Sequence, residues 1–379
     1  MNYSELTLPD ELRKAVERMG FTEMTEVQEK AIPLMLAGKD VTAKAPTGTG
    51  KTCAFGIPLI MNVKQDARYP QAVILAPTRE LAQQIAGDLR ELAHYYQSLK
   101  IVTVYGGANM EKQIEQLKSG AQIVVATPGR LQDHMNRHTV DVSHVTTVVL
   151  DEADEMLNMG FYKDVRKILD SIKSKQHLAM FSATISREVM DIGWLYQRDA
   201  EEITVQPIED NMPKIEQYMI LTTGRNKLAD LTGVILYRGY KRVMVFCNTK
   251  YTTAMLANQL SRLNFVADCL HGDLSQAERN KIMGSFKAGE IAVLCATDVA
   301  ARGIDVEDVD AVFNYDVPAS NEYYTHRIGR TGRAKREGES YILYTKEERA
   351  RVRDILRYTR NTATPIAFDE AGDLVKVED

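Results

Sequence analysis

The chain has 379 residues and a mass of 42.6 kDa, more than one hydrophobic core usually supports, so two domains are expected. Its hydrophobic share of 44% and charged share of 26% exclude a disordered or fibrous protein, and its net charge of -5 requires any polyanionic partner to meet a local basic patch. Neither a long apolar run nor a signal-peptide pattern is present, so we expect a cytoplasmic protein without a membrane partner.

Short β-branched runs alternate with helical stretches along the chain. In the first half they lie at residues 72–76, 101–105, 122–126, 145–150 and 178–181. The rhythm restarts in the second half at residues 243–247, 292–296, 310–314 and 340–344. This alternation predicts an α/β fold with two tandem domains, each a mainly parallel β-sheet flanked by helices on both faces.

A polar stretch between the two series of strands sets the expected domain limits. We predict an N-terminal domain over residues 1–206 and a linker over residues 207–217. A C-terminal domain follows over residues 218–365, and residues 366–379 form a short acidic tail.

The first motif, at residues 45–52, fits the P-loop pattern with alanine in the first glycine position. In such a loop, backbone N–H groups surround phosphate oxygens, the lysine reaches the β and γ phosphates, and the threonine hydroxyl binds Mg²⁺. We therefore predict that Lys51 is catalytic and that Thr52 is a ligand of Mg²⁺. The phosphate-binding residues predicted here are Thr47, Gly48, Thr49, Gly50, Lys51 and Thr52.

The apolar run at residues 145–150 leads directly into Asp151, Glu152, Ala153 and Asp154. A carboxylate at the carboxyl end of a strand can hold Mg²⁺ opposite a P-loop threonine, which assigns Asp151 to the metal. The adjacent Glu152 is then placed to orient or deprotonate the attacking water. The alternative, a helix start with acids near its positive end, is disfavoured by the P-loop upstream.

The sequence DEAD after a P-loop that ends in GKT resembles the DEAD-box family of RNA helicases, and further family motifs follow as far as residue 333. The resemblance implies two RecA-like domains that use ATP and Mg²⁺. It also implies RNA-stimulated ATP hydrolysis, which closes the two domains on RNA and locally unwinds short duplexes without processive tracking.

Residues before the P-loop resemble the Q motif of this family, in which a glutamine reads the adenine edge. Tyr3 stands where the family usually has phenylalanine, and Met24 and Glu26 stand where it usually has prolines. We expect adenine preference to survive with a modestly changed affinity. The residues that the resemblance places at the base are Tyr3, Phe21, Thr25 and Gln28.

Segments rich in glycine, hydroxyls and arginine follow several predicted strands, at sheet edges where open α/β folds bind ligands. Such groups are donors for backbone phosphates, and in the family they grip RNA without reading its sequence. Discrimination against DNA would then depend on 2′-hydroxyls. The implied RNA-binding residues are Pro77, Thr78, Arg79, Gly106, Gly107, Thr127, Pro128, Gly129, Arg130, Asn248, Gly272, Asp273, Arg279 and Thr297.

The remaining family motifs imply three further roles. Residues 326–333, HRIGRTGR, would supply Arg330 and Arg333 as catalytic arginine fingers, worth roughly three to five orders of magnitude in rate. Gly303 and Asp305 would bind ATP, with Asp305 at the ribose. The residues that would couple hydrolysis to strand separation are Asp154, Ser182, Thr184 and His326.

Two rival functions remain open: a DNA-directed helicase of the same superfamily, and an ATP-gated RNA clamp or scaffold that does not turn over. An unrelated P-loop kinase or transporter ATPase would not need the motifs of the second half. The physiological RNA is not identified by these residues. We expect a monomer recruited by partner proteins or by ribosomal or other ribonucleoprotein complexes, and analogy alone suggests RNA remodelling in ribosome assembly.

Overall fold

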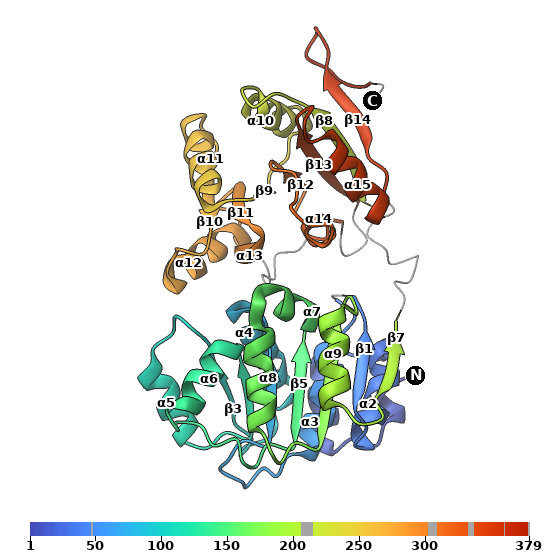
Figure 1. Ribbon diagram of the computed structural model, residues 1–379, viewed down its shortest axis with the longest axis vertical. Helices are drawn as coiled ribbons and strands as arrows, with labels where there is room; N and C mark the ends of the chain where they lie inside the picture. Colours follow the sequence, from blue (N-terminus) through green and yellow to red (C-terminus); the bar gives the residue numbers. More distant parts are fainter. Residues whose placement is uncertain (47, 206–214, 302–308, 333–336, 360, 378–379) are drawn as a thin grey trace. The chain divides into compact units, whose positions relative to one another are not determined.

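The computed structural model describes residues 1–377 except 47, 206–214, 302–308, 333–336 and 360 (Figure 1). The chain divides into two compact units, Met1–Ile208 and Glu209–Asp379. Each unit contains a predominantly parallel sheet with helices on both faces, which confirms the predicted fold class.

The sheet of the first unit has seven strands in the order β3-β4-β2-β5-β6-β1-β7. All of its recorded strand pairs are parallel. Its strands β2 and β4 are apolar and buried on both faces, as expected when helices cover both sides of a parallel sheet. The strands are β1 (Val41–Lys44), β2 (Ala72–Leu75), β3 (Ile101–Val104), β4 (Ile123–Ala126), β5 (Thr147–Asp151), β6 (His177–Ser182) and β7 (Glu201–Thr204).

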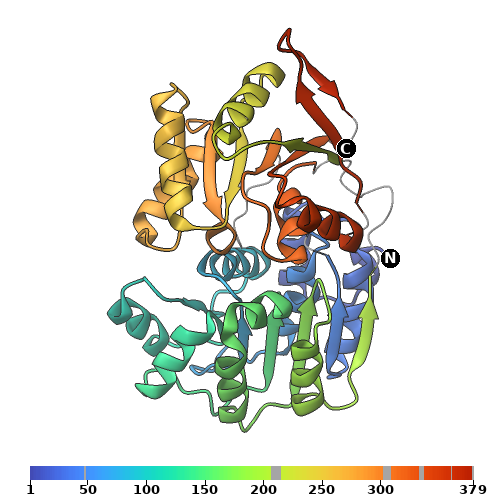
Figure 2. The ribbon, with the colours of Figure 1, turned by 45° about the horizontal axis from the view of Figure 1, so that its top comes forward.

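Two separate apolar cores lie on the two faces of this sheet. One core packs α1 to α4 against the sheet, and the other packs α5 to α9 against the opposite face (Figures 1 and 2). The helices are η1 (Tyr3–Glu5), α1 (Asp10–Arg18), α2 (Glu26–Leu36), α3 (Lys51–Asn62), α4 (Arg79–Leu92), α5 (Met110–Lys118), α6 (Pro128–Asn136), α7 (Ala153–Met156), η2 (Leu157–Phe161), α8 (Tyr162–Ser171) and α9 (Arg187–Tyr196).

The second unit has an eight-stranded sheet in the order β10-β11-β9-β12-β13-β8-β14-β15. Its pairs are parallel except for β14 with β15, which form an antiparallel hairpin at one edge. The strands are β8 (Ile215–Leu221), β9 (Val243–Cys247), β10 (Ala267–Leu270), β11 (Val293–Thr297), β12 (Ala311–Asn314), β13 (Gly338–Tyr344), β14 (Thr364–Phe368) and β15 (Leu374–Lys376).

The helices of the second unit also cover both faces of their sheet. One apolar core includes α10 and α11, while α12 to α15 contribute to two smaller clusters. The helices are α10 (Lys227–Arg238), α11 (Lys250–Arg262), α12 (Gln276–Lys287), α13 (Asp298–Ala301), α14 (Asn321–Ile328) and α15 (Arg349–Thr359).

The structure corrects two of the predicted segments. Residues 215–217, assigned to a linker, are the start of β8, where Tyr218 and Met219 continue the pairing with β13. Residues 366–379, assigned to an acidic tail, contain most of β14 and all of β15. The acidic composition concealed this hairpin, because among residues 366–377 only Ile366 is fully enclosed in the apolar core.

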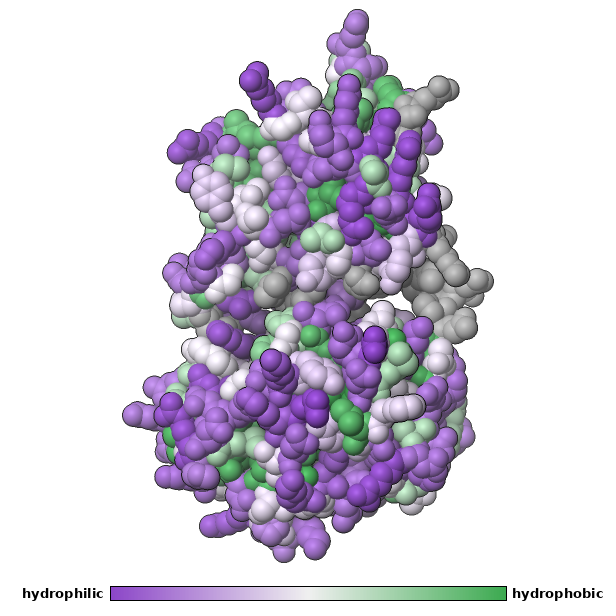
Figure 3. Space-filling model, in the orientation of Figure 1, coloured by the Kyte–Doolittle hydropathy of each residue, from purple (hydrophilic) through white to green (hydrophobic). Residues whose placement is uncertain are grey.

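No helix among the described residues is long and apolar enough to cross a membrane. In the view of Figure 3, hydrophilic side chains predominate and hydrophobic side chains gather only in small groups.

Candidate functional site

Strand order brings the motifs of the first unit together at one edge of its sheet. The strands β1, β6 and β5 are neighbours, and they lead into the P-loop, Ser182 and Asp151 respectively. The strands β2, β4 and β3 are also neighbours, and they precede Pro77, Thr127 and Gly106. Because the strands are parallel, all six segments lie at the carboxyl edge, one group beside the other.

The P-loop turns sharply from β1 into α3 through two glycines in the left-handed region, Gly48 at φ 80° and Gly50 at φ 82°. Glycine adopts this conformation without the steric cost of a side chain. Helix α3 then begins at Lys51, so the first N–H groups of the helix, including that of Thr52, are directed toward the loop. Such a helix start attracts phosphate through its free N–H groups and its dipole.

Lys51 and Asp151 form a buried but loose pair at the centre of this edge. Their Nζ and Oδ1 atoms are 3.9 Å apart, and only 6% and 4% of the two side chains is exposed. The Lys51 ammonium also donates to the carbonyl of Ala45 over 3.4 Å. Burial raises the pKa of Asp151, and the nearby Lys51 ammonium opposes that rise. Both side chains are thus buried and held by long contacts, an arrangement that a polyanionic ligand and a cation can improve.

Glu152 has φ 48° and ψ 51°, the left-handed conformation, directly between β5 and α7. A residue with a side chain pays a steric cost there, and such strain occurs often at functional sites. The N–H of Glu152 also donates to Oδ1 of Asp151 over 3.0 Å, which fixes the turn between the two acids.

Asp154 connects the end of β5 with the end of β6. Its Oδ2 accepts from both the N–H and the hydroxyl of Thr184, over 2.8 and 2.7 Å. In return, the N–H of Asp154 donates to the hydroxyl of Ser182 over 3.1 Å, and that hydroxyl donates to the carbonyl of Thr184. Three of the four predicted coupling residues therefore form one hydrogen-bond network, in which Asp154 and Ser182 are buried and Thr184 is exposed.

The segment before the P-loop packs on it through Gln28, a buried residue of α2. The Gln28 Oε1 accepts from the Tyr3 hydroxyl over 2.7 Å and from the Thr25 N–H over 2.9 Å. Its Nε2 donates to the carbonyl of Gly50, and the Thr25 hydroxyl donates to the carbonyl of Thr49. Gln28 thus joins Tyr3 and Thr25 to the P-loop, and the predicted contact of its Oε1 with adenine would have to replace one of these bonds.

The departures from the family's Q motif have simple physical reasons. Met24 is buried in the apolar core, and its N–H donates to the carbonyl of Met1. Glu26 is the first residue of α2, where a carboxylate interacts well with the helix dipole, and it also pairs with Lys30. Tyr3 and Phe21 stack with ring centroids 6.3 Å apart, and Phe21 remains 39% exposed.

The second group of motifs in the first unit is held together by Arg79 and the start of α4. The Thr78 side chain caps α4 by accepting from the Leu81 N–H. The Arg79 guanidinium lies against Gly106 and Gly107, so that a side chain at Gly107, whose φ is 83°, would collide with it. The glycine pair thus permits a close approach of Arg79 to the end of β3.

Gln113 is a buried residue of α5 that sequence reasoning missed. It joins the segment after β3 to the start of α6. Its Nε2 donates to the carbonyl of Tyr105 over 3.0 Å, and its Oε1 accepts from Arg130 over 3.1 Å. Arg130 also donates to the carbonyl of Ala108. The ring of His134 contacts the same Gln113 Oε1 over 3.0 Å. A polar residue four positions before buried Leu117, on the inward face of the helix, was the available signal.

Helix α6 completes this region with Thr127, Pro128 and Gly129. Thr127 precedes the helix, and its N–H donates to the carbonyl of Val104 at the end of β3. Pro128 occupies the first helical position, where its missing N–H has no cost, and Gly129 is exposed.

In the second unit, β10, β11 and β9 are adjacent and precede the residues predicted to bind RNA. Thr297 ends β11, and Gly272 is exposed after β10. Asp273 pairs with exposed Lys250 over 2.6 Å. Arg279 donates to the carbonyl of Ala300.

Asn248 contacts protein groups with its amide and its N–H. Its Oδ1 accepts from Arg327 over 2.9 Å, and its Nδ2 donates to the carbonyl of Val317 over 2.9 Å. Its N–H donates to Asp316. The predicted RNA contact of Asn248 would therefore have to use its own carbonyl, the second hydrogen of Nδ2 or the second lone pair of Oδ1, or displace these bonds.

Arg327 is a second residue that sequence reasoning left without a role. It is 1% exposed, and it makes a two-point contact with Asp298 over 2.6 and 2.7 Å. It also donates to Asn314 and to the carbonyl of Asp316, and its guanidinium lies over the ring of Phe246. Arg327 and Arg330 thus differ in burial. Arg327 is buried and bonds to several partners, whereas Arg330 lies half-buried after the end of α14.

His326 also lies on α14 and is half-buried. The predicted residues Thr47, Gly303, Asp305 and Arg333 lie outside the described residues.

Sequence comparisons cover both units. The profile of DEAD/DEAH box helicases matches residues 25–192, and that of the helicase conserved C-terminal domain matches residues 226–335. The ATP-dependent RNA helicase CshA of Listeria monocytogenes is 42% identical over 372 residues, covering 97% of this chain and 71% of that protein. The protein of the same name from Limosilactobacillus reuteri is 43% identical over 376 residues, covering 99% and 76%.

Solved structures are also similar. S. cerevisiae Dbp5 bound to RNA and ADP BeF3 matches with a TM-score of 0.85 and 32% identity, covering 96% of this chain and 95% of that one. A DEAD box protein from the hyperthermophile Methanococcus jannaschii is 41% identical, with a TM-score of 0.55 and coverage of 97% and 99%.

Proposed function

This chain belongs to the DEAD/DEAH box helicase family, and from that premise we propose that it is an ATP-dependent RNA helicase whose first unit binds the phosphates of ATP. The observation that carries the proposal is the convergence of the P-loop, the Lys51–Asp151 pair and the Asp154–Ser182–Thr184 network at one sheet edge. The relatives are named as ATP-dependent RNA helicases, which supports the same reaction.

The residues of this edge have different roles in ATP hydrolysis. Lys51 neutralises the phosphate charge that grows between the transferred group and the leaving group. Glu152, held in its strained turn, orients the attacking water and takes its proton. We propose that Arg330 and Arg333 of the second unit stabilise the transition state. That assignment makes both units necessary for turnover.

The donors near Lys51 fit a Mg²⁺ ion. Asp151 and Thr52 supply two hard oxygen atoms, and Mg²⁺ usually takes one or two protein ligands and completes its shell with water and phosphate. Among the described residues, no group of three or more His, Cys, Asp or Glu side chains could hold a metal ion. This agrees with a site in which the protein supplies only two ligands. When bound, the ion would neutralise phosphate charge and offset the burial of Asp151.

RNA binding is proposed for the neighbouring strand ends of each unit. Arg79, Arg130 and the start of α6 supply charge and N–H groups without base-reading geometry, so the contacts suit phosphates and sugars. We propose that ATP and RNA favour the same arrangement of the two units. Each ligand should then tighten the binding of the other by an equal factor, as linkage requires.

One enzymatic experiment tests the proposal against its two rivals. Phosphate release from ATP should rise at least about tenfold with single-stranded RNA and much less with DNA of equal length and sequence. Equal stimulation by DNA would support the DNA-directed rival, and RNA binding without turnover would support the clamp. Glu152→Gln should bind ATP and RNA but lose at least about a hundredfold in hydrolysis, within the range of general base catalysis.

A second experiment tests the arginine assignment. Arg333→Ala should retain ATP affinity within about threefold and lose hydrolysis by roughly three orders of magnitude. Loss of ATP binding instead would contradict the finger role. The wider roles that we propose, RNA remodelling within ribonucleoprotein particles such as assembling ribosomes, can be tested by crosslinking the protein to its RNAs in the source cell.

A further inference from the structure

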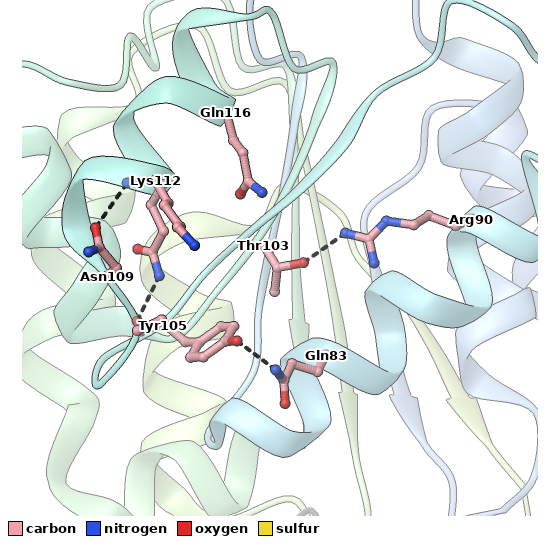
Figure 4. Close-up of a pocket in the computed structure, with 9 residues that line it drawn as sticks. Gln83, Arg90, Thr103, Tyr105, Asn109, Lys112 and Gln116 are labelled. Carbon is pink, nitrogen blue, oxygen red and sulfur yellow. Dashed lines mark hydrogen bonds between the residues drawn. The ribbon is translucent and has the colours of Figure 1, made fainter. Parts of the chain in front are cut away.

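A polar pocket of about 380 Å³ lies between α4, β3 and α5, at the edge of the first unit's sheet (Figure 4). Its volume falls in the range of about 300–1,000 Å³ that is usual for small-ligand sites. The pocket is separate from the P-loop, because β3 and β1 are separated by four strands in the sheet order. Its lining residues are Gln83, Arg90, Thr103, Tyr105, Ala108, Asn109, Lys112, Gln113 and Gln116.

The charge of this pocket is opposite to that of the whole protein. The described residues that line it include Arg90 and Lys112 and no carboxylate, although the net charge of the chain is -5. Helix α5 also begins at Met110 beside the pocket, and its dipole adds a positive partial charge there. An anionic ligand is therefore favoured over a cationic or apolar one.

Some polar groups in the wall are engaged, and others are available to a ligand. Gln83 donates to the Tyr105 hydroxyl over 2.5 Å, and Arg90 donates to the carbonyl of Ile101 and to the Thr103 hydroxyl (Figure 4). In the part of the chain that the structure describes, the Lys112 ammonium and the Gln116 side-chain amide have no protein partner. Both side chains are exposed on α5. The pocket thus offers a cation and an amide next to an ordered polar wall, the groups that contact a phosphate and a base or sugar edge.

The pocket adjoins the segments to which RNA binding was assigned above. Tyr105 lines the pocket and immediately precedes Gly106, while the carbonyl of lining residue Ala108 accepts from Arg130. Gln113 forms part of the wall and also contacts Arg130. An RNA strand lying on Gly106 and Arg130 would therefore be next to residues that line the pocket, whereas a free nucleotide would gain nothing from this continuity.

We propose that this pocket binds one additional nucleotide of the RNA strand, with its phosphate at Lys112 and Arg90 and its base or sugar edge at Gln116. The proposal rests on the proposed function, because it extends the RNA path along β3. It lengthens the strand that the first unit holds, and it predicts an increment of affinity that only a sufficiently long RNA can gain.

A length series of single-stranded RNA tests this site in the full chain. Affinity should rise by roughly threefold to tenfold when one added nucleotide reaches the pocket, and this step should vanish in Lys112→Ala and shrink in Gln116→Ala. The matched control is Lys118→Ala, on the same helix and exposed but outside the pocket, which removes the same charge. Lys112→Ala should also reduce the salt slope of binding to the longer RNA by about 0.7, the value for one phosphate of a single strand.

The possible outcomes separate this proposal from the proposed function. An unchanged length step in Lys112→Ala, or equal losses in Lys112→Ala and Lys118→Ala, would overturn the pocket as an RNA site. Arg130→Ala weakens RNA of every length if the neighbouring grip is correct; if it has no effect, the RNA assignment itself fails whatever the length series shows.

Discussion

Each unit contains a buried pair of opposite charges, and the two pairs differ in how well they are satisfied. In the first unit, Lys51 and Asp151 are 3.9 Å apart, and the ammonium makes one long contact to a carbonyl. In the second unit, Arg327 contacts Asp298 at two points within 2.7 Å and reaches three further acceptors. Burying charge costs several kcal/mol per ion, and close contacts offset that cost. These contacts support the proposed role of the loose pair in ligand binding and a structural role for the tight pair.

The largest expected effect on stability comes from breaking the tight pair. Arg327→Met should lower the free energy of unfolding of the second unit by about 3–5 kcal/mol, because the largely buried Asp298 and the buried Asn314 lose their partner. Chemical unfolding measures the change, and hydrogen exchange in β12 locates it. Arg357→Ala, an exposed change on α15, should alter stability by at most about 0.5 kcal/mol. A decrease in the free energy of unfolding of less than about 1 kcal/mol for Arg327→Met would contradict the distinction between the tight and the loose pair.

The Asp154 network should transmit hydrolysis to strand separation. Thr184→Val removes one of two hydrogen bonds to Asp154 while keeping the shape of the side chain. We expect unwinding of a short RNA duplex to fall at least about tenfold, with ATP hydrolysis within about threefold of wild type and a stability cost of roughly 1 kcal/mol. Parallel measurements of unwinding and phosphate release check this; equal losses in both would contradict a coupling role.

Gln28 should affect nucleotide affinity through the P-loop. Gln28→Ala removes its bonds to Tyr3, Thr25 and Gly50, so ATP should bind about tenfold more weakly, the equivalent of about 1.4 kcal/mol. Calorimetric titration with ATP and GTP provides the measurement. Equal weakening for both nucleotides would show that Gln28 shapes the P-loop without reading adenine, and unchanged ATP affinity would contradict both roles.

His134 gives the smallest expected effect, a pH dependence of stability. Burial, followed by the nearby Arg130, lowers the pKa of His134 below its ordinary value of 6.5. As the pH falls through 6.5, His134 therefore binds a proton in the unfolded chain but not in the folded protein. The free energy of unfolding decreases until the pH reaches the pKa of His134 in the folded state. His134→Gln should remove this acid-side loss. Thermal unfolding between pH 7.5 and 5 tests it, and identical pH profiles for both proteins would contradict the assignment.

Much of this arrangement follows from local sequence, because apolar strands and glycine turns have strong patterns. The runs at 72–76, 122–126 and 243–247 agree with β2, β4 and β9 to within a residue. Strands β1, β7 and β10 were not predicted. Strand β10 has no β-branched residue, β7 lies largely exposed at a sheet edge, and β1 is only four residues long with an exposed lysine at its end. Their existence depends on pairing with distant strands.

The site shows the same division between local and long-range information. The P-loop and the DEAD acids are contiguous motifs and are recognisable in one dimension. Gln113 and Arg327 are single polar residues within helices, and their importance depends on partners that the fold brings to them. Sequence spacing cannot distinguish buried Arg327 from half-buried Arg330, because both belong to one short basic run.

Thermal unfolding of wild type and Lys51→Ala, each with and without Mg²⁺ and a non-hydrolysable ATP analogue, tests the central claim most directly. Lys14→Ala, exposed on α1, is the matched control. If the loose pair exists for the ligand, all three unliganded proteins should unfold within about 2 °C of one another. The analogue should then raise the unfolding temperature of wild type and Lys14→Ala but not that of Lys51→Ala. A Lys51→Ala protein that unfolds several degrees lower without ligand, yet is stabilised normally by the analogue, would contradict the account.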